Sequence, residues 1–316
     1  MLYLDKEDIS NVKYSWQHIV ECISETIKKI LSGEIDQPIK PYLQFENHRN
    51  RIIAMPARIG NEGGISGIKW IASFPENLQI GIDRAQSITI LNSNKTGEIV
   101  SIINTSLVSS IRTAGVSAYF LDDYFNKIKK SRIKVLIIGF GPLGRMHLAM
   151  LEKLFYNIIS EVYIYDKKNI VIKPNDFTNF SVKILEGPLS KKFKGADLVI
   201  TCTTSKQGYL FEKPKLGSVH LNVSLRDYHY NMREYFDYII VDKWTEVCRA
   251  NTDIEVMFNE KKLYQDEVFE IQDIKTIQYQ KDDTIFFSPM GMACFDIAIG
   301  KLFYELSIKQ KVGKDF

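Results

Sequence analysis

Apolar residues recur with two different periods along the chain. From Ser15 to Leu31 they return every three or four positions and Gly33 follows, which predicts a helix that ends at the glycine. The next predicted elements are short β-rich runs bounded by glycine, proline or asparagine: residues 51–56, 66–72, 85–91 and 98–103. A hairpin loop joins the last two runs, so we expect a mixed or antiparallel sheet in this region.

Strands and helices alternate in the rest of the chain. A helix is predicted from Ser106 to Tyr119, and a last, amphipathic helix from Met292 to Gln310. Between them the predicted strands are residues 134–138, 161–165, 182–185, 196–201, 218–223 and 238–241. This alternation predicts a doubly wound parallel sheet of the Rossmann type, in an α/β protein with a second, smaller α+β domain. The boundaries that we expect are 119–289 for the Rossmann-type domain and 1–118 with 290–316 for the smaller one.

Three glycines follow the first strand of the alternating region. Gly139 permits a tight turn, Gly141 lets a pyrophosphate approach the backbone, and Gly144 lets the helix lie close to the strand. The turn residues expected to contact a dinucleotide are Gly139, Phe140, Gly141, Pro142, Leu143 and Gly144. Asp166 ends the next strand about 20 residues later, where a carboxylate accepts hydrogen bonds from an adenosine ribose. It favours NAD over NADP because its charge repels a 2′-phosphate, although two lysines follow it. The alternative is an ordinary βα turn with a surface aspartate.

Later strand ends should face the same cofactor, because ligands gather at the carboxyl ends of parallel strands. The further residues expected to contact it are Thr201, Cys202, Thr203, Asn222, Val223, Ser224 and Met290. Asp227 is the candidate general base, since an acid at a strand end is well placed for proton transfer beside a nicotinamide. A solvated loop aspartate is the alternative, and His229 is the competing acid or base.

Several cations are candidates for binding an anionic substrate. Lys69 interrupts an apolar strand and would need a partner or a ligand if it were buried, or it faces outward. Arg112 could clamp a carboxylate or phosphate with two hydrogen bonds, or it is an exposed helical arginine. Lys40 and Arg84 are ambiguous, and solvated surface charge is the default interpretation of both.

Composition narrows the class of protein. The chain has 316 residues, 45% of them hydrophobic and 25% charged, which describes a globular protein with a full core. Its net charge of +3 is too small for a nucleic-acid surface. The four cysteines are far apart, and neither they nor the histidines have metal-ligand spacing. Without a signal peptide or an apolar run that could span a membrane, we expect a cytoplasmic protein that binds no metal.

Together these residues resemble the ornithine cyclodeaminase/mu-crystallin family over nearly the whole chain. The matching segments are Met55-Pro56, Gly67-Ile-Lys69, Arg112-Thr113-Ala114, the glycine turn, Asp166, His220-Leu-Asn222, Asp227 and Met290-Gly291. The resemblance implies that the smaller domain binds substrate and forms a homodimer through its sheet. It implies catalysis by Asp227 and Lys69, and cofactor contacts from Arg112 and Thr113. The implied substrate ligands are Lys40, Met55, Lys69, Arg84, Arg112 and Gly291.

The resemblance is closer to the branch that makes 2,3-diaminopropionate for siderophores and peptide antibiotics. It implies NAD-dependent oxidation of N-(2-amino-2-carboxyethyl)-L-glutamate, followed by hydrolysis to 2-oxoglutarate and 2,3-diaminopropionate. Asn231 stands where deaminating members commonly have lysine, and Arg84 where ornithine cyclodeaminases have a small hydroxyl residue, so both disfavour ornithine. The alternatives are an ornithine cyclodeaminase, an alanine or imino-acid dehydrogenase, and a non-catalytic binder of cofactor and ligand like mu-crystallin.

Overall fold

The computed structural model describes residues 1–47, 50–172 and 179–316, which form two compact units. Unit 1 comprises Met1–Gly115 and Gly291–Phe316, and unit 2 comprises Val116–Met290. The chain passes from unit 1 to unit 2 within helix α3 (Leu107–Lys127) and returns immediately before helix α8 (Ala293–Gln310). Unit 1 is therefore discontinuous in sequence.

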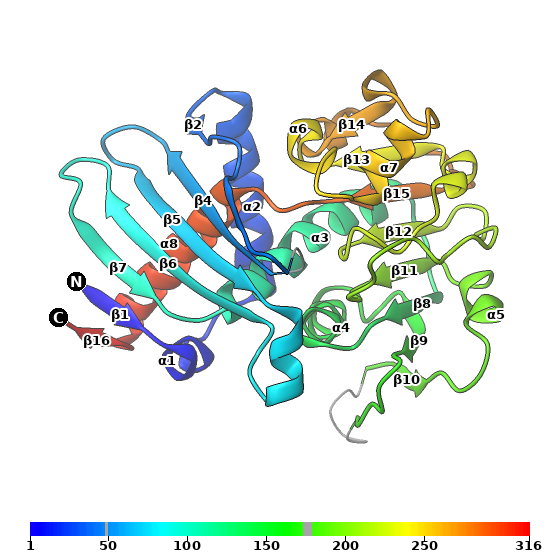
Figure 1. Ribbon diagram of the computed structural model, residues 1–316, viewed down its shortest axis with the longest axis horizontal. Helices are drawn as coiled ribbons and strands as arrows, with labels where there is room; N and C mark the ends of the chain where they lie inside the picture. Colours follow the sequence, from blue (N-terminus) through cyan, green and yellow to red (C-terminus); the bar gives the residue numbers. More distant parts are fainter. Residues whose placement is uncertain (48–49, 173–178) are drawn as a thin grey trace. The chain divides into compact units, whose positions relative to one another are not determined.

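Unit 1 is built on a mixed sheet with the strand order β16-β1-β7-β6-β5-β4-β2, and β3 also pairs with β4 (Figure 1). Strands β4 to β7 are antiparallel neighbours, whereas β1 runs parallel to β7. The strands are β1 (Leu2–Leu4), β2 (Ile35–Asp36), β3 (Tyr42–Gln44), β4 (Arg51–Ile59), β5 (Ile65–Ser73), β6 (Ala85–Ser93), β7 (Ile99–Ile103) and β16 (Lys314–Asp315). The other elements of this unit are α1 (Lys6–Asn11), α2 (Trp16–Leu31) and the 3-10 helix η1 (Pro75–Ile80).

Helix α8 packs on β4, β5 and β6 and on α2. Gly67 of β5 gives room for this approach, because a Cβ there would lie 3.0 Å from Ile297 Cδ1 of α8. The same Cβ would lie 2.2 Å from Ile90 O of the neighbouring strand β6. The amphipathic pattern predicted for this helix is wrong for its first half, where every residue from Ala293 to Gly300 is buried. Sheet and α2 both contact the helix, so it has no solvated face there. One of the residues enclosed in this way is Asp296.

Unit 2 holds a sheet in which every neighbouring pair of strands is parallel, and this confirms the predicted fold class (Figure 1). The strand order is β10-β9-β8-β11-β12-β15-β13-β14. The strands are β8 (Ile133–Ile138), β9 (Ile159–Tyr165), β10 (Ser181–Ile184), β11 (Leu198–Thr201), β12 (Val219–Asn222), β13 (Tyr238–Val241), β14 (Val268–Glu270) and β15 (Ile285–Ser288). The order reverses direction between β8 and β11, which is the switch point where such sheets bind ligands.

The helices of unit 2 are mostly short. They are α4 (Pro142–Leu154), α5 (Leu189–Phe193), α6 (Trp244–Val247), α7 (Asp253–Asn259) and the 3-10 helices η2 (Tyr230–Tyr235), η3 (Gln265–Glu267) and η4 (Ile271–Thr276). Helix α3 runs eight residues beyond its predicted end at Tyr119, because Phe120, Leu121 and Tyr124 are fully buried and continue its apolar face. Within the described ranges, no helix combines the length and the hydrophobicity that crossing a membrane requires.

Candidate functional site

Unit 1 contains a buried cluster of charges at the contact of α8 with β5 and α3. Oδ1 of Asp296 lies 2.9 Å from Lys69 Nζ and 2.9 Å from Arg112 Nε. Lys69 also donates to the hydroxyl of Ser109 at 3.1 Å. Its side chain is only 3% exposed, so the outward-facing alternative for Lys69 is wrong. The exposed-helix alternative for Arg112 is wrong for the same reason, since its side chain is 7% exposed.

These buried charges shift one another's protonation. Burial lowers the pKa of Lys69, as do the charges of Arg112 and Lys40, while the carboxylate of Asp296 raises it, and the net result is a pKa of about 8. Burial also acts to raise the pKa of Asp296, but the charges of Arg112 and Lys69 hold it below its usual value. The carboxylate is therefore ionised at neutral pH, and Lys69 titrates close to the physiological range.

Two more of the predicted residues, Lys40 and Gly291, lie beside this cluster. The carbonyl oxygen of Gly291 accepts a hydrogen bond from Lys40 Nζ at 2.8 Å, and Lys40 is buried. Gly291 has a φ of +95°, which favours glycine, and a Cβ there would lie 2.6 Å from Arg112 Nη1. A side chain at this position would therefore displace the guanidinium.

The remaining substrate ligands predicted in unit 1 occupy two different places. Met55 is buried and is the Cα partner of Lys69 across β4 and β5, so it lies beside the cluster. Arg84 precedes β6 and is half-buried. The Cα partner of Lys69 in β6 is Thr89, which places Arg84 roughly 17 Å along the strand from that pairing. The structure thus brings together Lys40, Met55, Lys69, Arg112 and Gly291 but not Arg84.

In unit 2 the glycine turn follows β8, and Gly141 is the N-cap of α4. Gly139 has a φ of +91°, and a Cβ there would lie 2.5 Å from the carbonyl oxygen of Cys202. At Gly144 a Cβ would lie 2.2 Å from the oxygen of Gly139. At Gly141, by contrast, a Cβ would meet nothing within 4 Å. Two glycines therefore permit close packing, and the third leaves the backbone at the helix N-terminus open.

Asp166 directly follows β9 and is hydrogen-bonded to the glycine turn. Its Oδ2 accepts from the backbone N–H of Phe140 at 2.6 Å, and its Oδ1 accepts from that of Lys168 at 2.8 Å. The ring of Phe140 in turn lies under the guanidinium of Arg145, 4.5 Å from ring centroid to Cζ. The carboxylate is thus fixed beside the turn, where a ribose hydroxyl would be recognised.

Asp227 is buried at the carboxyl end of β12 and accepts hydrogen bonds from two predicted cofactor residues. Thr203 Oγ1 donates to its Oδ1 and Ser224 Oγ donates to its Oδ2. Burial raises the pKa of Asp227, while the hydrogen bonds from Ser224, Thr203 and Tyr209 lower it. The solvated-loop alternative for Asp227 is therefore wrong. Its rival His229 is a half-buried cap of η2, where its Nδ1 accepts from Asn231 N at 3.3 Å.

A second buried acid holds this loop in place and was missed from the sequence. Oδ2 of Asp253 accepts from the backbone N–H groups of Asp227 and Tyr228, each at 3.0 Å, and from Asn222 Nδ2 at 3.0 Å. Asn222 also donates to Ser288 Oγ at 3.2 Å and accepts from Thr201 Oγ1 at 3.1 Å. Burial and the nearby charge of Asp227 raise the pKa of Asp253 to about 8. The ends of β11, β12 and β15 thus share one buried polar network.

The other predicted cofactor residues of unit 2 stand beside this network. Val223 follows β12 and is buried, and Cys202 follows β11, where its N–H donates to Ile138 O at 2.7 Å. Burial raises the pKa of the Cys202 thiol, so the thiol is not ionised at neutral pH. Met290 N donates to Asp242 Oδ1 at 3.1 Å. Within the described residues, no group of three His, Cys, Asp or Glu side chains is arranged to hold a metal ion.

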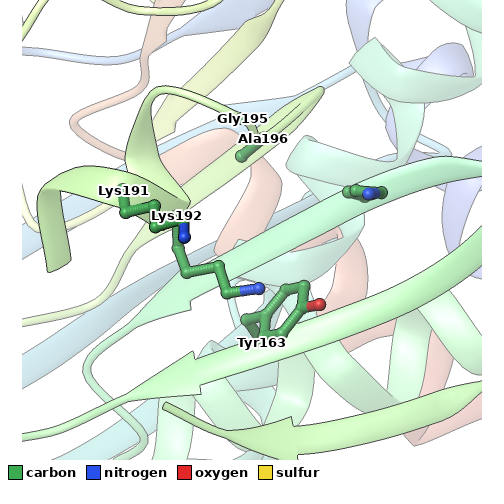
Figure 2. A pocket seen from close by; sticks show the side chains of 6 residues that line it. Tyr163, Lys191, Lys192, Gly195 and Ala196 are labelled. Carbon is green, nitrogen blue, oxygen red and sulfur yellow. The ribbon is translucent and has the colours of Figure 1, made fainter. Parts of the chain in front are cut away.

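Two surface pockets lie within unit 2, away from these strand ends. One, of about 190 Å³, is lined by Asn231, Arg233, Glu234 and Lys262. The other, of about 140 Å³, is lined by Lys134, Tyr163, Lys191, Lys192, Gly195 and Ala196 (Figure 2). There Lys192 Nζ lies 3.6 Å from the centroid of the Tyr163 ring. Lys134 is the second residue of β8 and Ala196 precedes β11, so this pocket is near the amino ends of these strands.

Comparison with known proteins connects both units to one family. A profile of the ornithine cyclodeaminase/mu-crystallin family matches residues 4–311. The chain belongs to this family. It is 30% identical to N-((2S)-2-amino-2-carboxyethyl)-L-glutamate dehydrogenase of Staphylococcus aureus, over 99% of this chain and 97% of that protein. It is 23% identical to the alanine dehydrogenase of Archaeoglobus fulgidus, over 99% and 97% of the two chains.

Solved structures agree with the fold of an ornithine cyclodeaminase/mu-crystallin family member. Δ1-Pyrroline-2-carboxylate reductase of Thermococcus litoralis, solved with NADH and L-proline, superposes with a TM-score of 0.86 over all of both chains at 19% identity. An archaeal alanine dehydrogenase dimer with bound NAD gives a TM-score of 0.80 at 21% identity, over 100% of this chain and 98% of that one. These structures confirm the fold, and the family profile and the Staphylococcus aureus relative confirm the family resemblance seen in the sequence.

Proposed function

We propose that the protein is an NAD-dependent amino-acid oxidoreductase that acts on a CH–NH donor. Its proposed substrate is N-(2-amino-2-carboxyethyl)-L-glutamate, which it converts to 2-oxoglutarate and L-2,3-diaminopropionate for siderophore or peptide antibiotic biosynthesis. The observation that carries the proposal is the buried cluster of Lys40, Lys69 and Arg112, in which Asp296 offsets only part of the positive charge. Such a cluster suits a ligand that carries carboxylates.

The choice of substrate has two supports. The Staphylococcus aureus relative, at 30% identity over nearly the full chain, is named as a dehydrogenase of this substrate. The substrate also has three carboxylates, and a hydrogen bond between charged groups contributes about 1.5–3 kcal/mol. The alanine dehydrogenase and pyrroline-carboxylate reductase relatives share the coarser chemistry, the redox interconversion of an amine and an imine beside a carboxylate.

The residues of unit 2 fit a nicotinamide dinucleotide. The open backbone at Gly141 and the N-terminus of α4 suit a pyrophosphate, because free N–H groups and the helix dipole favour negative charge there. The carboxylate of Asp166, held beside the turn by Phe140, suits the ribose hydroxyls and disfavours a 2′-phosphate. These features support NAD as the cofactor.

NAD, when bound, would supply the hydride acceptor for oxidation at the glutamate-derived Cα. The protein's own residues orient the substrate and move protons. Lys69 and Arg112 hold a substrate carboxylate with charge-assisted hydrogen bonds. Asp227 polarises the water that attacks the substrate imine, and collapse of the carbinolamine then releases diaminopropionate. Burial raises the pKa of Asp227 toward the working pH, which improves it as a general base.

The two units are assigned separate tasks in this proposal. Unit 2 binds the dinucleotide, and unit 1 binds substrate and forms a homodimer through its sheet. In support, the residues of β4 to β7 that alternate with those facing α8 form an apolar surface: Ile52, Ala54, Pro56, Ile68, Trp70, Ala72, Ile88, Ile90 and Ile102. Trp70, in the middle of it, is 39% exposed. An exposed apolar surface of this kind is typical of a protein–protein interface. We separately propose that the dimer is cytoplasmic.

Two other functions remain as alternatives. A cyclodeaminase or an alanine or imino-acid dehydrogenase would use the same unit 2 with a different substrate. A non-catalytic binder like mu-crystallin would hold cofactor and ligand without turnover, but it has no use for a base, and Asp227 is buried with its hydrogen bonds made.

A substrate panel followed by NADH absorbance separates these functions. We expect NADH formation with the glutamate adduct and at least 100-fold lower kcat/KM with ornithine and alanine. Preference for ornithine or alanine would establish the first alternative. Cofactor binding by calorimetry without turnover of any amino acid would establish the second.

A further inference from the structure

Asp296 is a buried acid on α8 to which neither the sequence nor the relatives assign a role. We propose that Asp296 is a positioning residue, which holds the cationic ends of Lys69 and Arg112 in the one orientation that binds a substrate carboxylate. The inference rests on the proposed function, because it takes Lys69 and Arg112 as the carboxylate ligands. Its physical basis is that a single oxygen, Asp296 Oδ1, contacts both cations at 2.9 Å.

The contact with Arg112 decides which edge of the guanidinium a ligand meets. Asp296 engages Nε, so the end-on pair Nη1 and Nη2 stays outside this contact. That pair forms the fork that binds a carboxylate with two parallel hydrogen bonds. Gly291 borders the same two nitrogens, since a Cβ there would lie 2.6 Å from Nη1 and 3.0 Å from Nη2. Asp296 thus holds the guanidinium at Nε. Because Gly291 has no side chain, it does not cover Nη1 and Nη2.

The contact with Lys69 similarly commits part of the ammonium group. An ammonium has three N–H donors. Asp296 Oδ1 accepts from one at 2.9 Å and Ser109 Oγ accepts from a second at 3.1 Å. The third N–H of Lys69 therefore has a fixed direction relative to Nη1 and Nη2 of Arg112, because Asp296 Oδ1 contacts both side chains.

Asp296 also keeps Lys69 charged. The groups that face Lys69 are Asp296 on α8, Arg112 and Ser109 on α3, and Lys40 before β3. Burial and the two cations lower the pKa of Lys69, and Asp296 opposes them. Without the carboxylate, Lys69 would lose its proton at a lower pH and would then no longer attract an anion.

The test uses Asp296→Asn in the full-length protein. The amide keeps an oxygen for Lys69 and Arg112 and removes only the charge, since Asp296 Oδ2 has no hydrogen-bond partner in the described part of the chain. In the wild type we expect KM for the glutamate adduct to rise above pH 8, as Lys69 deprotonates. In the variant this rise should begin at least one pH unit lower, so that KM at pH 8 is about 5-fold higher or more. At low pH kcat should stay within about 3-fold, and KM for NAD should not change.

Two variants separate positioning from a general loss of structure. Asp296→Glu keeps the charge, and we expect it to restore the pH profile to within half a unit of wild type. Asp123→Asn removes an acid of α3 that pairs with Lys127 at 2.8 Å, and it should leave the profile unchanged. Thermal unfolding checks that each variant folds. If Asp296→Asn does not, Asp296→Ser, which leaves space for water beside the cations, is measured with the same expectation.

A titration of Lys69 decides the inference without any turnover. Carbon-13 NMR of protein labelled at the lysine ε-carbons follows the amine directly, and Lys69→Arg assigns its signal. We expect a midpoint near pH 8 in the wild type and a lower one in the folded Asn or Ser variant. An unchanged or higher midpoint overturns the inference. A wild type inactive on the adduct would overturn the proposed substrate instead, and the NMR titration would still decide the role of Asp296.

Discussion

Gly291 has no side chain at the point where Arg112 presents its guanidinium, and a Cβ there would lie only 2.6 Å from Nη1. The backbone at Gly291 also has a φ of +95°. These two features can be separated experimentally, because Gly81 shares the positive φ, at +74°, and a Cβ there would meet nothing within 4 Å.

Gly291→Ala should therefore damage substrate binding, whereas Gly81→Ala should only lower stability. Strain at a positive φ costs both variants about 1 kcal/mol of unfolding free energy. Displacement of the guanidinium should raise KM for the glutamate adduct about 10-fold or more in Gly291→Ala alone. Steady-state kinetics with denaturant unfolding checks this, and equal KM values for the two variants would contradict it.

Asp227→Asn should lower kcat by about 100-fold or more, because the amide cannot take a proton from the attacking water. The affinity for NADH, measured by fluorescence titration, should stay near the wild-type value. Asp197→Asn is the matched control, since Asp197 precedes the amino end of β11 and pairs with Lys215 at 2.6 Å. An Asp227→Asn variant with wild-type turnover would remove this residue from the mechanism.

Asp166→Ser should relax the choice between NAD and NADP. The substitution removes the charge that repels a 2′-phosphate, and with it the carboxylate that accepts from Phe140 N of the glycine turn and from Lys168 N. We expect the ratio of kcat/KM for NAD to that for NADP to fall by about 10-fold or more. A ratio equal to that of the wild type would show that other residues select the cofactor.

Trp70→Glu should convert the proposed homodimer to a monomer, because it places a charge within the apolar surface of β4 to β7. Phe211→Glu is the control, since Phe211 is a 67% exposed aromatic of unit 2. Light scattering after size-exclusion chromatography gives the mass of each variant. A wild type of monomer mass would exclude the homodimer. A dimeric Trp70→Glu variant would show that the dimer interface lies elsewhere.

The glycine turn and the strands β4 to β13 were readable from the sequence because their signals are local. Gly139, Gly141 and Gly144 mark a βα turn by spacing alone, and alternation of strands with helices implies a parallel sheet. The position of β15 between β12 and β13 was not readable, because strand order depends on contacts between segments far apart in sequence.

Within the candidate site, the sequence indicated that Lys69 and Arg112 could be buried. It did not indicate that both pair with Asp296. Asp296 appeared as one polar residue in a helix taken to have a solvated face. Its signal was a single charge among apolar residues from Ala293 to Gly300, which demands a buried partner once the helix is enclosed. Asp253 gave no such signal, because its acceptor role is toward backbone N–H groups that any sequence has.

Mass spectrometry of the products tests the central claim most directly. The wild-type protein is incubated with N-(2-amino-2-carboxyethyl)-L-glutamate and NAD, and the amine and keto-acid products are quantified against NADH. We expect 2,3-diaminopropionate and 2-oxoglutarate in equal amounts, each matching the NADH formed. Recovery of the intact adduct, under conditions in which ornithine or alanine is consumed, would contradict it.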